Sequence, residues 1–157
     1  MPPKTLVDLG SLDLSRLVAG PDEIRRFNAQ RYEMEQLDGI IHLDVDQGLI
    51  VGFKDVGDDE FWVRGHIPGR PLFPGVLMCE AVAQLCSYYY KAASREERFL
   101  GFGGLDDVKF RGEVAPGDRL ILVARCNELR SRRATFSCQA FVDGRMVYQG
   151  TIIGMPM

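Results

Sequence analysis

GHIPGRPLFPGVLMCEAVAQLC, residues 65–86, contains the pattern from which the fold of this 157-residue chain can be predicted. Its prolines at positions 68, 71 and 74 each fix one φ angle and push the preceding residue toward an extended conformation, which indicates a stiff loop. Pro74 then suits the first position of a helix, which we expect to run to about residue 93. Residues 76–86 are apolar on every side except at Glu80 and Gln84, so other parts of the chain must surround this helix.

Strand-like patterns lie on both sides of the helix. Before it we expect strands at 40–44 and 49–56, joined at Gln47-Gly48, a short extended piece at 61–63, and a short helix capped by Asp22 that ends at Phe27. After it we expect strands at 99–110, 120–126, 135–142 and 146–153, with turns at 116–118 and 143–144. This order predicts an α+β fold in which one antiparallel sheet packs around a central helix. We expect residues 1–20 to form a loosely held leader and residues 21–157 a single domain.

Composition excludes several classes of protein. The chain is 46% hydrophobic and 26% charged, which is typical of a globular protein, and its net charge of −3 argues against nucleic acid as a partner. Asp8 and Asp13 interrupt the N-terminus where a signal peptide would be apolar, and Glu80 with the prolines argues against a membrane span. Four cysteines without a CxxC pair indicate a reducing compartment, so we expect a cytoplasmic protein. Two histidines without spaced partners predict no metal site and no cofactor.

Glu80 and Gln84 are the first candidate site residues. Burial in an apolar helix is expected to raise the pKa of a carboxyl group, which can then act as a general acid near neutral pH. Gln84 lies four residues later on the same helix face, where its amide can orient Glu80. The structural alternative is a glutamate that reaches solvent or pairs with an arginine.

His66 and the helix start are the other candidates. His66 opens the proline loop, and an unperturbed histidine side chain has a pKa that suits a general base near neutral pH, although His66 can also serve as a structural hydrogen-bond donor. Phe73, the expected N-cap, has no side-chain acceptor, so the N–H groups of Gly75 and Val76 are expected to be free to polarise a carbonyl oxygen. Capping by a distant carbonyl is the alternative. Base, acid and N–H groups together suit the removal of water from a 3-hydroxyacyl thioester.

Residues 65–84 closely resemble the signature of the 3-hydroxyacyl-[acyl-carrier-protein] dehydratases of bacterial fatty-acid synthesis. The likeness extends over roughly residues 24–153 and includes VGFKDVGDDEFWVRGH before the helix and GLDDVKFRGEVAPGDRLIL after it. It implies a hotdog fold, with His66 and Glu80 as the catalytic pair. From their places at the helix start and on the Glu80 face, we expect Gly75, Val76 and Gln84 to bind the substrate. The likeness also implies a homodimer, with a higher assembly of dimers open, whose sites take the histidine from one subunit and the acid from the other.

The resemblance has one departure and leaves several functions open. Gln30-Arg31-Tyr32-Glu33-Met34 stands where the family usually has a His-Arg-Tyr-Pro-Phe-like segment, which leaves chain-length preference open. The thioester carrier is expected to be acyl carrier protein or coenzyme A. The alternatives are a hotdog thioesterase, a non-catalytic acyl-binding protein, and a specialised dehydratase of a polyketide, lipid-A or pigment pathway.

Overall fold

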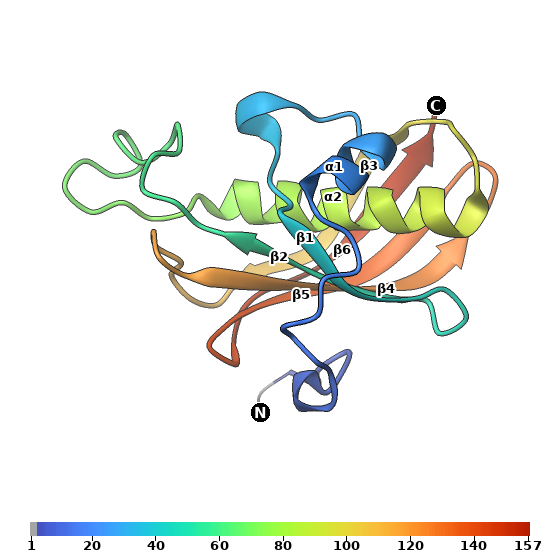
Figure 1. The fold of residues 1–157 in the computed structure, drawn as a ribbon, viewed down its shortest axis with the longest axis horizontal. Helices are drawn as coiled ribbons and strands as arrows, with labels where there is room; N and C mark the ends of the chain where they lie inside the picture. The colour runs from blue at the N-terminus through green and yellow to red at the C-terminus, as the bar shows by residue number, and fades with distance from the viewer. Residues whose placement is uncertain (1–2) are drawn as a thin grey trace.

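A six-stranded antiparallel sheet with one long helix across one of its faces forms the protein in the computed structural model, which describes residues 3–157 (Figure 1). The strand order is β1-β2-β4-β5-β6-β3, so β1 and β3 form the two edges. The α+β class is confirmed. The elements are the 3-10 turns η1 (Leu9–Ser11) and η2 (Tyr32–Met34), the helices α1 (Pro21–Phe27) and α2 (Gly75–Ser94), and the strands β1 (Gly39–Asp44), β2 (Leu49–Asp55), β3 (Leu100–Phe110), β4 (Arg119–Leu129), β5 (Ala134–Val142) and β6 (Arg145–Pro156).

The predicted turns are confirmed, and they set the register of the sheet. At Asp143-Gly144 both residues have positive φ angles, 49° and 78°, as a two-residue hairpin with the natural strand twist requires. The strand after this hairpin runs further than expected, to Pro156. It lengthens because β3 is its neighbour, and the ladder ends with Phe99 and Met157 exchanging N–H···O bonds of 3.1 and 2.8 Å.

The core lies between α2 and the inner face of the sheet, as expected for a helix that is apolar on most sides. Leu85 and Cys86 are fully buried, and the Tyr89 ring meets the Phe136 ring edge-on with centroids 5.8 Å apart. On the other side α1 covers the helix, where Phe27 stacks on Tyr88 at 4.6 Å. No helix within residues 3–157 is long and apolar enough to cross a membrane.

Two local expectations are wrong. Residues 61–63 form turns instead of an extended piece, because the Trp62 carbonyl accepts the N–H groups of Gly65 at 3.2 Å and His66 at 2.8 Å. Asp22 does not cap α1: the N-cap is Gly20, Pro21 takes the first helical position, and Asp22 lies in the first turn.

Residues 3–14 are not loosely held. They lie on the sheet face opposite α2 (Figure 1), where Leu6, Leu9 and other leucines pack against a second apolar cluster around Val51 and Val123. The Gln139 side-chain amide forms two hydrogen bonds with the backbone of this segment. Its oxygen accepts the Leu6 N–H and its nitrogen donates to the Lys4 carbonyl, both at 2.8 Å. The sheet therefore has apolar packing on both faces.

Candidate active site

The loop before α2 holds His66 in one orientation. Its Nδ1 lies 2.8 Å from the Leu72 carbonyl oxygen, and because a carbonyl only accepts, Nδ1 carries the proton. The backbone of His66 is anchored at both ends, with its N–H donating to Trp62 and its carbonyl accepting from the Leu72 N–H, each at 2.8 Å. Residues 67–70 close a tight turn between these anchors. In the neutral form of the exposed ring Nε2 then carries the free lone pair, and this is the form of histidine that acts as a general base.

The start of α2 presents backbone N–H groups beside this loop. The N-cap is Pro74 instead of the expected Phe73, and it has no side-chain cap. Its carbonyl accepts the N–H groups of the third and fourth residues after it, at 2.9 and 3.3 Å. Gly75 and Val76 have no acceptor for their N–H groups among residues 3–157, which leaves two donors at the positive end of the helix dipole.

A carboxyl–amide pair lies one turn further along α2. The Gln84 Nε2 donates to Glu80 Oε1 at 2.9 Å and to the Met34 carbonyl at 2.7 Å, while Gln84 Oε1 accepts the Gln36 N–H at 2.9 Å. The Gln84 backbone carbonyl also accepts from Asn28 Nδ2 at 2.9 Å. Both amide protons of the buried Gln84 side chain are thus used within the chain, one of them on Glu80.

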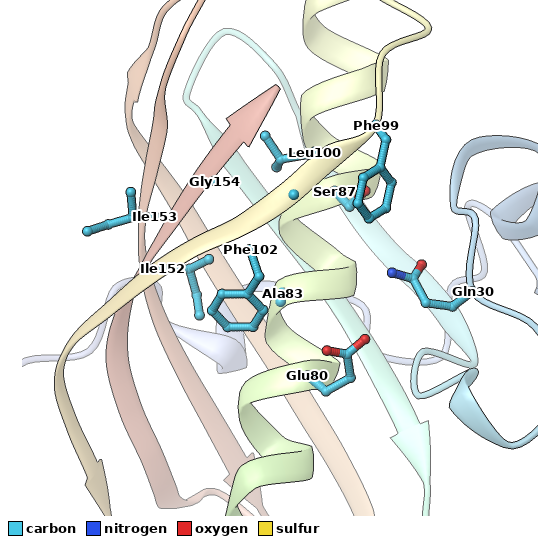
Figure 2. A pocket seen from close by; sticks show the side chains of 11 residues that line it. Gln30, Glu80, Ala83, Ser87, Phe99, Leu100, Phe102, Ile152, Ile153 and Gly154 are labelled. Carbon is cyan, nitrogen blue, oxygen red and sulfur yellow. The ribbon is translucent and has the colours of Figure 1, made fainter. Parts of the chain in front are cut away.

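Glu80 opens into a cavity of about 280 Å³ between α2 and the edge of the sheet (Figure 2). Ala83 and Ser87 line it from the same face of α2, residues 99–102 line it from the start of β3, and Ile152 from β6. Glu80 is half-buried here, not fully buried as the apolar helix suggested. Its carboxylate stands at one end of a wall that is otherwise largely apolar.

His66 opens into a different hollow of about 330 Å³. Gly75 and Val76 share this hollow, and Phe110 at the far end of β3 forms part of its wall. The structure thus brings the histidine together with the free N–H groups, and brings Glu80 together with Gln84. It does not bring His66 and Glu80 into one hollow, since the two hollows have no residue in common.

The cysteines do not offer a nucleophile beside these groups. Burial raises the pKa of Cys79, Cys86 and Cys126 above the usual value for a thiol. A protonated thiol is a poor nucleophile, which leaves the His66 imidazole and the Glu80 carboxylate as the candidate reactive groups of this region.

Several cavity residues were not among the predicted site residues. Ala83 and Ser87 follow Glu80 at spacings of three and seven, so helical periodicity alone places them on its face. Gln30 also lines the cavity, although it lies fifty positions before Glu80. The only sequence signal for Gln30 is that it belongs to the segment 30–34, which departs from the usual pattern of the family.

Comparison with known proteins identifies relatives of this chain. A family model described as a FabA-like domain matches residues 28–151. The 3-hydroxyacyl-[acyl-carrier-protein] dehydratase FabZ of Teredinibacter turnerae is 35% identical over 137 residues, covering 83% of this chain and 92% of that protein. The same enzyme of Clostridioides difficile is 35% identical over 133 residues, covering 84% and 93%.

Solved structures confirm the hotdog fold. A chain of the dehydratase heterocomplex ApeI:P from Xenorhabdus doucetiae superposes with a TM-score of 0.73 at 14% identity, covering 85% of this chain and 90% of that one. Zebra fish thioesterase superfamily member 2 gives a TM-score of 0.63 at 11% identity, covering 84% and 91%. The fold is thus shared with thioesterases, whereas the sequence is shared with dehydratases. The chain belongs to the FabA-like family of 3-hydroxyacyl-[acyl-carrier-protein] dehydratases.

Proposed function

We propose that this protein removes water from 3-hydroxyacyl thioesters and produces trans-2-enoyl thioesters in a site that two copies of the chain share. The observation that carries the proposal is the separation of the acid from the base. His66 and Glu80 line hollows at opposite ends of the edge strand β3, one beside Phe110 and the other beside residues 99–102.

A two-fold axis through the middle of β3 would join these hollows. Within residues 3–157 β3 pairs with β6 alone, so its other edge is free and carries the exposed side chains of Phe102, Leu105 and Phe110. An apolar free edge is a surface for strand pairing. If β3 pairs antiparallel with itself about Leu105, its start faces the end of the partner strand. Each Glu80 cavity then meets the other chain's histidine loop.

The hydrogen bonds of each group indicate which step of the reaction it performs. His66 Nε2 takes the proton from C2 of the substrate, and the N–H groups of Gly75 and Val76 stabilise the negative charge on the thioester oxygen. Glu80, held by Gln84, protonates the 3-hydroxyl group. The C2–H and C3–O bonds break, the C2–C3 double bond forms, and water leaves. Gln84 acts as a positioning residue, not as the substrate contact expected from the sequence.

The thioester carrier and the location belong to the same proposal. The relatives named above are acyl-carrier-protein dehydratases, and a hotdog neighbour from Streptococcus mutans was solved bound to acetyl coenzyme A. We place the reaction in the cytoplasm, on acyl carrier protein as the first choice and coenzyme A as the second.

Purified protein with enoyl and 3-hydroxyacyl thioesters tests the activity. Absorbance of the conjugated enoyl thioester follows hydration and dehydration, while a thiol reagent follows hydrolysis in the same sample. We expect interconversion without free thiol, lost by orders of magnitude in His66→Ala and Glu80→Gln. Thiol release without hydration would instead make the protein a thioesterase.

A further inference from the structure

Ser87 places an unpaired hydroxyl group at the end of the cavity away from Glu80. Its side chain is buried, with 4% of the residue exposed, and it lines the cavity. Ser94 on the same helix behaves in the ordinary way and donates to the carbonyl four residues earlier, on Tyr90, at 2.6 Å. Ser87 makes no such bond and has no hydrogen-bond partner among residues 3–157.

Gln30 places a second unpaired group on the same cavity. Its Oε1 is buried without a hydrogen-bond partner in the described part of the chain. Figure 2 shows the carboxamide beside the cavity, with its nitrogen toward α2. Asn28, two residues earlier, is tied to the helix through the Gln84 carbonyl, so the segment that carries Gln30 is held in place.

Apart from Ser87 and Gln30, this end of the cavity is apolar. Phe99, Leu100 and Ile152 form the facing wall. A buried polar atom without a partner destabilises the fold, so Gln30 Oε1, on the same cavity as the unbonded Ser87 hydroxyl, indicates a bound group that pairs with both. A hydroxyl suits them, since it can donate to Gln30 Oε1 and accept from the Ser87 hydroxyl, whereas a ketone only accepts and would leave Gln30 Oε1 unpaired.

We propose that Ser87 and Gln30 bind a second hydroxyl group far along the acyl chain, so that the preferred substrate is a hydroxylated acyl thioester instead of a plain alkyl one. This rests on the proposed function, which puts C3 at Glu80. Seven helical residues separate Glu80 from Ser87, a rise of about 10 Å. A carbon–carbon bond of ~1.5 Å advances an extended chain by ~1.25 Å, so the second hydroxyl lies about eight bonds beyond C3, near C11.

Two substrates of one length test this specificity. We compare 3-hydroxydodecanoyl and 3,11-dihydroxydodecanoyl pantetheine thioesters by their kcat/KM values. The wild-type enzyme is expected to favour the dihydroxy substrate about tenfold, mainly through KM. Ser87→Ala and Gln30→Leu should each bring that ratio close to one. Ser94→Ala, the matched control on the same helix, should keep the wild-type ratio.

A wild-type ratio of one or below, unchanged in both variants, would overturn the proposal and indicate that water occupies the polar end. Calorimetry with dodecanoyl and 11-hydroxydodecanoyl pantetheine separates this inference from the activity. If neither substrate is dehydrated, the proposed function fails. Tighter binding of the hydroxylated ligand, lost in Ser87→Ala, would still support the hydroxyl site, and equal binding would refute it.

Discussion

Replacement of Gln84 by methionine should weaken both the fold and the reaction. Methionine keeps the length of the side chain and removes three hydrogen bonds, to Met34, Glu80 and Gln36. Met34 is 42% exposed and Glu80 half-buried, so water can replace two of them. Gln36 is 1% exposed, and its orphaned N–H costs about 1–3 kcal/mol. With ~1 kcal/mol for the other two, we expect Gln84→Met to lower the free energy of unfolding by about 2–4 kcal/mol.

Urea denaturation measures the first effect and steady-state turnover the second. The midpoint should fall without a change in slope, and kcat should fall at least about tenfold because Glu80 loses its orienting donor. Gln47→Met is the control, since Gln47 is exposed and its substitution should stay within about 0.5 kcal/mol. If Gln84→Met unfolds at the wild-type urea concentration and turns over at the wild-type rate, the assigned positioning role is wrong.

Three further predictions concern stability. Gly52→Ala should cost about 3 kcal/mol or more, because the new Cβ would lie 2.6 Å from the Gly39 carbonyl oxygen, whereas Gly65→Ala meets nothing within 4 Å and should be nearly neutral; urea midpoints compare them. Burial raises the pKa of Asp38, so its charged form opposes folding as pH rises, and Asp38→Asn should stabilise the protein more at pH 7 than at pH 3 in pH-dependent denaturation. Gln139→Ala should free residues 3–14 from the outer face, which faster amide exchange there would report, and unchanged exchange would contradict.

Local patterns were enough to predict the helix and most of the strands. The predicted helix start at Pro74 and the hairpin at Asp143-Gly144 depend on backbone angles that proline and glycine restrict or permit, and the structure agrees within a residue or two. The prediction for residues 61–63 failed because Phe, Trp and Val are residue types that favour strands, whereas the Trp62 carbonyl organises a turn that depends on the following loop. The packing of the N-terminal segment could not be predicted, because only the finished sheet provides the face that its leucines cover.

The candidate site was predictable where its parts are close in sequence. The Glu80–Gln84 hydrogen bond follows from i,i+4 spacing on a helix. Gln30 joins the cavity only after α1 and η2 have packed against α2, so no local pattern could place it there. The proposed sharing of the site between two chains depends on a free edge of the sheet, which exists only once all six strands are ordered.

Mixing two inactive variants tests the shared site most directly. His66→Ala and Glu80→Gln chains, each inactive alone, are co-expressed with different tags, and the doubly tagged protein is compared with the wild type. A mixed dimer should contain one doubly damaged site and one intact site, so the doubly tagged fraction should recover about half of the wild-type activity. A dimer in light scattering whose mixed form stays inactive would contradict the shared site and require His66 and Glu80 to act within one chain.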